Sequence, residues 1–258
     1  SPLSLKDFLD ENCEIRDEGC WNKKSNRRIK ACMPMHTFGF PCEIDKIKSI
    51  CDDYGLRLIE DAAESIGSFF GDKHTGTFGD FGIISFNGNK VITTGAGGVI
   101  LTENKDIALL AKHLTTTAKL PHKWNFDHDI SGYNYRMPNL NASLGIPQMN
   151  KLKFLLKEKR KIAKNYIDWG KENGFHFKEE IKGTTCNYWL NTLIAKDKKE
   201  RDMLLEITNK ASIMTRPAWT PMHELPFNKS FQRDELKNTA WLADRVLNVP
   251  SSPRKNAR

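Results

Sequence analysis

The sequence predicts an α/β protein in which a mainly parallel sheet is flanked by helices and a smaller α+β domain follows towards the C-terminus. The first observation is a segment with apolar residues at helical spacing, 43–54, followed directly by the apolar run 56–59. The second is the apolar run 81–84, which leads into a polar loop. Because crossover loops converge at the carboxyl ends of parallel strands, we expect the site there.

Composition and charge are those of a globular protein without a nucleic-acid partner. The 258 residues are 39% hydrophobic and long enough to bury a sizeable core. The net charge of +8 comes from residues 146–258, which hold 23 basic and 13 acidic residues. The lysines of 151–161 alternate with an apolar stripe, a pattern typical of a solvated helix face rather than a nucleic-acid site.

The cysteines and the apolar runs indicate a cytoplasmic protein. Six cysteines are scattered without a C-x-x-C pair or histidines at ligand spacing, so we expect reduced thiols and no metal site. No apolar run approaches the roughly 20 residues that span a bilayer, and the first residues show no signal-peptide pattern. We therefore expect no membrane association.

The first 40 residues predict two elements separated by an insertion. Residues 4–10 have the pattern of a short helix, and the polar segment 11–28 predicts an irregular surface insertion. A buried strand is expected over 29–38. His36 lies near the end of that strand, where both a structural hydrogen-bonded role and a role near the active site stay open.

The central part continues the alternation of helices and strands. The helix over 43–54 is expected to bury one face against the sheet, and the strand 56–59 follows it. After the glycines at 95–98, a strand over 98–103 returns antiparallel or alongside, and a helix covers 106–114. The residues expected to face inward are Ile44, Ile47, Ile50 and Cys51 in the first helix and Ile107, Leu109, Leu110 and Leu114 in the second.

The C-terminal part predicts a long helix and then a small domain. The amphipathic helix runs from 147 to about 169, and a strand over 188–194 and a helix over 200–211 follow it. We expect a large domain over 1–145, a linking helix over 146–174 and a small domain over 175–258.

Acids and a lone lysine mark the candidate site. Glu60 and Asp61 end the strand 56–59, where an aspartate suits the ring nitrogen of a pyridine-type cofactor; alternatively, the two acids begin the next helix. Lys90 is the only charged residue between Asp80 and Glu103. A lysine held neutral near pH 7 becomes a nucleophile, although a lysine in a polar loop is commonly an ordinary solvated residue.

Five motifs in order carry a specific resemblance. They are Ile-Glu-Asp-Ala-Ala-Glu-Ser at 59–65, Gly-Thr-Phe-Gly-Asp at 76–80, Ser-Phe-Asn-Gly-Asn-Lys at 85–90, Thr-Thr-Gly at 93–95 and Gly-Tyr-Asn-Tyr-Arg at 132–136. With them the chain resembles the nucleotide-sugar aminotransferases of the DegT/DnrJ/EryC1/StrS family. The resemblance implies the PLP-dependent transferase fold type I, with pyridoxal 5'-phosphate as cofactor and 1–145 as its binding domain.

The resemblance also implies roles for individual residues. Lys90 matches the lysine that forms the Schiff base with the cofactor, Asp61 matches the partner of its pyridinium nitrogen, and Ser85 matches a phosphate ligand. Glu64 lies where many members carry glutamine near the cofactor's 3-oxygen. Asn134 matches an asparagine that reaches the cofactor phosphate of the neighbouring subunit, so a homodimer is implied.

For the substrate, the resemblance implies a nucleotide-linked sugar. The loop 115–128 has little periodicity, and in related enzymes this region lies near the sugar nucleotide. The expected substrate-binding residues are Lys119, His122, Trp124 and Arg216. The implied reaction moves an amine from glutamate to a UDP-linked 4-keto-6-deoxy-N-acetylhexosamine, as in bacillosamine or legionaminic acid synthesis, while GDP-linked and dTDP-linked sugars stay open.

One departure from the family affects the cofactor. Family members carry a Gly-Thr phosphate loop and a ring-stacking residue in an N-terminal part that has no counterpart here, and the chain begins with Ser1. We therefore expect an N-terminally incomplete domain. The alternative hypothesis is a non-catalytic binding protein that keeps the fold without holding the cofactor.

Overall fold

Two units make up the chain in the computed structural model, which describes residues 1–253. The first unit holds Ser1–Phe154 and Lys182–Asn187, and the second holds Leu155–Ile181 and the described part of Tyr188–Arg258. The segment Lys182–Asn187, expected in the small domain, belongs to the first unit because strand β11 (Thr184–Thr185) pairs with β6 (Phe69–Phe70).

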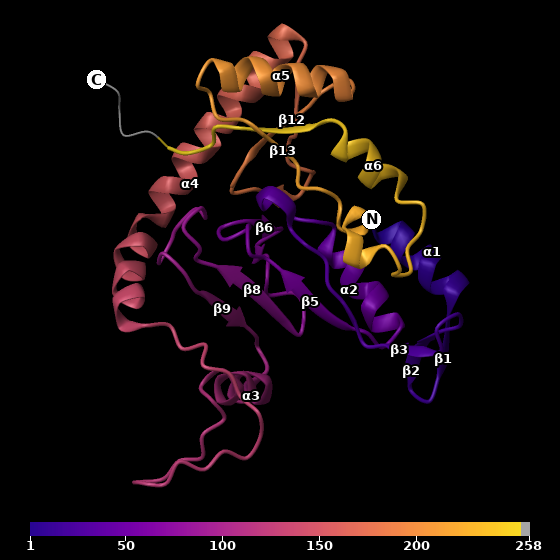
Figure 1. The fold of residues 1–258 in the computed structure, drawn as a ribbon, viewed down its shortest axis with the longest axis vertical. Helices are drawn as coiled ribbons and strands as arrows, with labels where there is room; N and C mark the ends of the chain where they lie inside the picture. The colour runs from indigo at the N-terminus through magenta and orange to yellow at the C-terminus, as the bar shows by residue number, and fades with distance from the viewer. Residues whose placement is uncertain (254–258) are drawn as a thin grey trace. The chain divides into compact units, whose positions relative to one another are not determined.

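The central sheet of the first unit has the order β4-β5-β8-β9, and Figure 1 labels its strands β5, β8 and β9. The pairs β4–β5 and β5–β8 are parallel, whereas β8 and β9 are antiparallel. Because β5 and β8 run in the same direction, their last residues lie at the same edge of the sheet. The bounds are Ala31–Cys32 for β4, Arg57–Asp61 for β5, Phe81–Ser85 for β8 and Gly98–Leu101 for β9.

Helix α2 (Ile44–Asp53) buries the face that its periodicity predicts. Leu58 of β5 is 1% exposed and joins the same apolar cluster, as does Leu9 of α1 (Pro2–Asn12). This cluster is the core of the first unit behind β5. The buried residues of α2 are Ile44, Ile47, Ile50 and Cys51, as expected.

The sequence predicted an irregular insertion over 11–28. The segment instead forms an antiparallel three-stranded sheet. Asp17 and Glu18 connect the first two strands with φ of 47° and 55°, the backbone of a two-residue type I′ hairpin. The polar composition hides the strands because the buried positions are two cysteines, a glycine and an asparagine rather than large apolar residues. The strands are β1 (Cys13–Arg16), β2 (Gly19–Asn22) and β3 (Arg27–Ile29).

The single strand expected over 29–38 is also wrong. Only Ala31–Cys32 joins the ladder with β5, and Met35 makes one further bridge to Asp61. Pro34 has no N–H to continue the ladder. The chain then turns through a short 3₁₀ segment, η1 (Thr37–Gly39), in which Phe38 has a φ of 58°.

Helix α3 (Lys105–Thr115) forms as expected, and the side chain of Asn104 caps its first turn. Its inward face is not as expected, because no α3 residue is buried within residues 1–253. Leu109 and Leu110 are 58% and 53% exposed. The chain that follows α3 projects beyond that helix before returning to α4 (Figure 1).

Helix α4 (Asn139–Asn173) is one helix of 35 residues that contributes to both units. It continues through Pro147, where the long amphipathic helix was expected to begin. Among the helices of the described chain, none combines the length and apolar composition that crossing a membrane requires.

The second unit contains an antiparallel sheet of order β10-β12-β14-β13. Its core gathers Phe177, Leu193, Ala195 and Leu247. The strands of this sheet are β10 (His176–Phe177), β12 (Asn191–Ile194), β13 (Arg216–Pro217) and β14 (Val246–Val249). The α-helices of the second unit that follow α4 are α5 (Lys198–Lys210) and α6 (Lys237–Ala243). The remaining elements of the described chain are β7 (Lys73–His74), η2 (Met222–Glu224) and η3 (Pro226–Asn228).

Candidate functional site

The carboxyl ends of β5 and β8 bring Asp61 and Ser85 to one edge of the sheet. Asp61 does not begin a helix, because a turn follows β5. Its Oδ1 accepts a hydrogen bond from the Ala63 amide at 3.1 Å. Ser85 Oγ accepts from the Asn87 amide at 3.3 Å, so its hydroxyl proton stays available to a ligand.

Lys90 and Glu64 lie side by side. Lys90 Nζ is 3.6 Å from Glu64 Oε1, and their side chains are 12% and 8% exposed. The loop that carries Lys90 is held by a turn in which the Lys90 amide donates to the Asn87 carbonyl at 3.1 Å. The other carboxylate oxygen of Glu64 accepts from the Phe38 amide at 2.7 Å. The amine is therefore held in a largely buried place.

The pKa of Glu64 depends on burial and on its charged and polar neighbours. Burial raises the pKa of Glu64 above its ordinary value, and the charge of Asp61 adds to this rise. The Phe38 amide and the Lys90 ammonium act in the opposite direction but do not cancel it. Asp61, Glu64 and Lys90 thus interact electrostatically in one site, although they come from three separate sequence positions.

A second buried carboxylate lies next to this site. Glu60 and His36 are fully buried, and His36 Nε2 lies 3.0 Å from Glu60 Oε2. Burial opposes ionisation of Glu60, but hydrogen bonds from His36, Gly76 and Gly79 outweigh it and hold the pKa of Glu60 below its ordinary value.

This role of Glu60 was not predicted from the sequence. A signal was present in the strand's period of two, because Leu58 and Glu60 share the buried face of β5. A carboxylate on a buried strand face predicts a set of donors around it. The donors themselves were not predictable, since they come from loops far along the chain.

Asn134 and residues 120–128 of the expected substrate-binding loop are exposed, whereas Lys119 is half-buried. Asn134 makes a backbone bridge to Thr116. Lys119 Nζ lies 3.8 Å from the ring centroid of Phe126, and His122 Nδ1 accepts from the Asn125 amide at 2.9 Å. Trp124 is 72% exposed. These contacts are internal to the segment that follows α3.

Arg216 belongs to the second unit, on strand β13. Its guanidinium donates to Asn209 Oδ1 at 3.0 Å and to the Thr215 carbonyl at 2.8 Å. The side chain is thus tied to helix α5 of its own unit.

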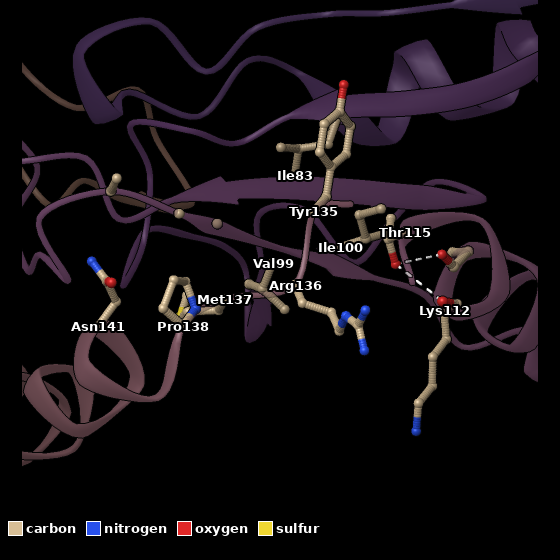
Figure 2. Close-up of a pocket in the computed structure, with 14 residues that line it drawn as sticks. Ile83, Val99, Ile100, Lys112, Thr115, Tyr135, Arg136, Met137, Pro138 and Asn141 are labelled. Atoms are coloured by element: carbon tan, nitrogen blue, oxygen red, sulfur yellow. Dashed lines mark hydrogen bonds between the residues drawn. The ribbon is translucent and has the colours of Figure 1, made fainter. Parts of the chain in front are cut away.

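A pocket of about 700 Å³ lies beside β9 and the end of α3, and Figure 2 shows its lining. Its walls include Val99 and Ile100 of β9, with Lys112 and Arg136 as its cations. Thr115 is fixed by its hydroxyl, which donates to the Ala111 carbonyl at 2.7 Å. No predicted site residue lines this pocket, so the chemistry is assigned to the sheet edge instead.

The chain matches a known protein family over nearly its whole length. Residues 17–257 match the family model described as "DegT/DnrJ/EryC1/StrS aminotransferase family". The chain is 35% identical over 234 residues to GDP-perosamine synthase of Vibrio cholerae, covering 90% of this chain and 64% of that protein. It is also 35% identical over 227 residues to EpsN of Bacillus subtilis (strain 168), covering 88% of this chain and 56% of that protein. EpsN is classed by name, provisionally, as a pyridoxal phosphate-dependent aminotransferase.

Solved structures share the fold. Helicobacter pylori PseC, an aminotransferase involved in the biosynthesis of pseudoaminic acid, superposes with a TM-score of 0.87 at 19% identity. The match covers 100% of this chain and 66% of PseC. The chain spans less than two thirds of the length of the curated relatives named above.

Proposed function

Because the chain belongs to the DegT/DnrJ/EryC1/StrS aminotransferase family, we propose that its protein is a pyridoxal phosphate-dependent aminotransferase that aminates a nucleotide-linked keto sugar. The observation that carries the proposal is the largely buried Lys90 amine beside Glu64, on the sheet edge where Asp61 ends β5. The name of EpsN supports the same cofactor.

The residues present fit this cofactor. Lys90 supplies an amine that condenses with an aldehyde, and Asp61 supplies a carboxylate suited to a ring nitrogen. Ser85 supplies a hydroxyl suited to a phosphate. Glu64 supplies a carboxyl group beside Lys90, and burial raises its pKa above the ordinary value. This set of an amine, a carboxylate, a hydroxyl and an acid matches the groups of pyridoxal phosphate.

The protein's part in the reaction is proton transfer and charge placement. When bound, pyridoxal phosphate supplies an aldehyde that takes up the amine and a ring that withdraws electrons. Asp61 would keep a proton on the ring nitrogen. Lys90 Nζ would move a proton from the carbon that carries the donor's amine to a carbon of the cofactor, and in the second half-reaction from that carbon to the sugar carbon that takes the amine. Glutamate is the proposed donor.

The proposed acceptor is a 4-keto-6-deoxy sugar linked to a nucleoside diphosphate. The sequence resemblance favoured a UDP-linked N-acetylhexosamine, whereas the GDP-perosamine synthase relative favours a GDP-linked sugar. We take the GDP-linked sugar first and keep the UDP-linked sugar as the alternative. Lys119, His122, Trp124 and Arg216 remain the proposed substrate contacts.

A homodimer completes the proposed site. Asn134 is exposed, and its sequence neighbours Tyr133 and Tyr135 stack on each other with ring centroids 5.2 Å apart. This exposure supports a role towards a second subunit, where the asparagine would reach the neighbouring cofactor phosphate.

Two measurements test the proposal. The first is the absorbance spectrum of the purified protein with pyridoxal phosphate, before and after borohydride, beside Lys90→Ala. A band that borohydride fixes covalently in the wild type, and that the variant lacks, is expected. The second follows ¹⁵N from labelled glutamate into GDP-linked and UDP-linked 4-keto-6-deoxy sugars by mass spectrometry. A chain that folds but shows neither result would be the non-catalytic binding protein.

A further inference from the structure

Glu60 and His36 form a buried pair next to the proposed cofactor site, and we propose that they are positioning residues for Asp61 and Glu64. The inference rests on the proposed function only for what Asp61 and Glu64 do. The contacts by which the pair positions these two residues lie within the protein and do not depend on a bound cofactor. Neither Glu60 nor His36 is proposed to touch the cofactor.

The surroundings of Glu60 require a carboxylate. Its Oε2 accepts from His36 Nε2 at 3.0 Å and from the Gly76 amide at 2.7 Å. Its Oε1 accepts from the amides of Phe78 and Gly79 at 2.5 and 2.8 Å. All four contacts are N–H donors, and an ionised carboxylate is the side chain that only accepts. Glu60 therefore ties the loop Gly76–Gly79 to strand β5.

The hydrogen-bond partners of His36 set its orientation. The Cys42 amide donates to His36 Nδ1 at 3.2 Å, and Cys42 Sγ lies 3.4 Å from the same nitrogen. Burial and the charge of Glu60 raise the pKa of Cys42 to about 12, so its sulfur is a neutral thiol. Since both groups around Nδ1 are donors, the ring proton is on Nε2, where it meets Glu60.

The backbone around His36 connects this pair to the site. The His36 amide donates to the Asp61 carbonyl at 3.0 Å. Two residues later, the Phe38 amide donates to Glu64 Oε2 at 2.7 Å. Phe38 holds a φ of 58°, a left-handed conformation that a bulky residue keeps only when its surroundings enforce it. The segment from His36 to Phe38 thus contacts both acids, and the His36–Glu60 bond anchors its start.

The pair acts by holding the backbone of the segment from His36 to Phe38. Its loss is therefore expected to change that backbone in particular, and not only to lower the stability of the whole chain. Without the His36–Glu60 bond, Phe38 is expected to leave its left-handed conformation and its amide to leave Glu64. Glu64 would then lose a donor that opposes the rise of its pKa. Both changes occur at residues that Glu60 does not touch.

The test compares two substitutions of one residue. In His36→Gln, the side-chain amide is expected to donate to Glu60 and its oxygen to accept from Cys42, so that both bonds would be kept. His36→Leu keeps the volume and loses both. Leu9→Ala is the control, because Leu9 is 1% exposed in the core and has no part in this network.

The first readout needs no cofactor. Hydrogen exchange of the Phe38 amide is measured by NMR in the cofactor-free protein. We expect His36→Leu to speed this exchange by about tenfold or more, with His36→Gln and Leu9→Ala close to the wild type. If His36→Leu speeds it no more than Leu9→Ala does, or if His36→Gln behaves like His36→Leu, the pair has no positioning role.

The second readout uses the protein loaded with pyridoxal phosphate. The pH midpoint of the cofactor's absorbance is expected to move in His36→Leu and to be restored in His36→Gln. An unmoved midpoint in His36→Leu would overturn the positioning of Asp61 and Glu64. If the wild type binds no cofactor, the proposed function fails, and the Phe38 exchange still decides whether the pair holds the segment.

Should His36→Leu not fold, Glu60→Gln provides the same comparison. Glutamine keeps the size of the side chain but places an N–H₂ group among four donors. The same faster exchange of Phe38 and the same displaced midpoint are expected, and their absence in a folded Glu60→Gln protein would overturn the proposal.

Discussion

The Lys90 amine lies 3.6 Å from Glu64 Oε1, and both side chains are almost entirely withdrawn from solvent. This proximity joins a loop residue after β8 to a turn residue after β5. It makes Glu64 the neighbour that responds to any change of charge on Lys90.

Replacing Glu64 with glutamine is expected to change how stability depends on pH. Burial and Asp61 raise the folded-state pKa of Glu64 above its ordinary value of 4.5, so the folded chain binds the proton more tightly than the unfolded chain. The contribution of Glu64 to the free energy of unfolding is therefore greatest at low pH and falls as pH rises from about 4.5 through the folded-state pKa. Glu64→Gln removes this fall.

Urea unfolding at several pH values between 4 and 8 measures the effect. The stability of Glu64→Gln relative to the wild type should increase with pH across this window. A constant difference would show that the pKa of Glu64 is the same in the folded and unfolded chains.

Lys90→Ala is expected to abolish covalent trapping of pyridoxal phosphate by borohydride, because no amine remains at that place. Lys112→Ala is the control, since Lys112 is exposed on α3 and makes no part of the sheet-edge site. Peptide mapping by mass spectrometry locates the label. Labelling that persists in Lys90→Ala at another lysine would move the site.

Asp61→Asn is expected to lower the rate of amine transfer by roughly 10²-fold or more, since an amide does not hold a proton on the ring nitrogen, and such preorganised charges are typically worth that much. Cofactor binding should be reduced less than the rate. Steady-state kinetics and equilibrium binding separate the two. An unchanged rate in Asp61→Asn would remove Asp61 from the proposed chemistry.

Gly79→Ala is expected to destabilise the first unit by about 1–3 kcal/mol, the usual cost of forcing atoms into a packed interior. A Cβ at Gly79 would lie 2.3 Å from the Leu58 carbonyl oxygen, and the shift would loosen the Gly79 amide from Glu60. Gly88→Ala is the matched control, because its nearest neighbour would be 3.9 Å away. Thermal unfolding compares the two, and equal losses would contradict this account.

Much of the local structure followed from the sequence. Helix α2 was predicted because apolar residues recur every three or four positions, and each of them is buried. The family motifs identified Lys90, Glu64 and Asp61 as candidate site residues. In the structure, the side chains of Lys90 and Glu64 lie close together. The roles of these residues stay predictions.

Other local predictions failed because they depend on which residues are buried, and the residue composition of a segment does not show this. The hairpin of β1 and β2 was missed because Cys20 and Asn22 fill its buried positions instead of large apolar residues. Helical spacing predicted that Leu109 faces inward, but Leu109 is exposed. Spacing indicates which residues share a helix face and does not show what packs against that face.

The sequence by itself determined the order of helices and strands around β5 and the residue types after β5 and β8, because periodicity and turn residues are local properties of the chain. Only the tertiary structure decided that Glu60 gathers His36 and the amides of Gly76 and Gly79. The physical reason is that a buried carboxylate has to be satisfied by donors wherever the fold delivers them. Those donors lie 16 to 24 positions away along the chain, beyond the reach of any local pattern.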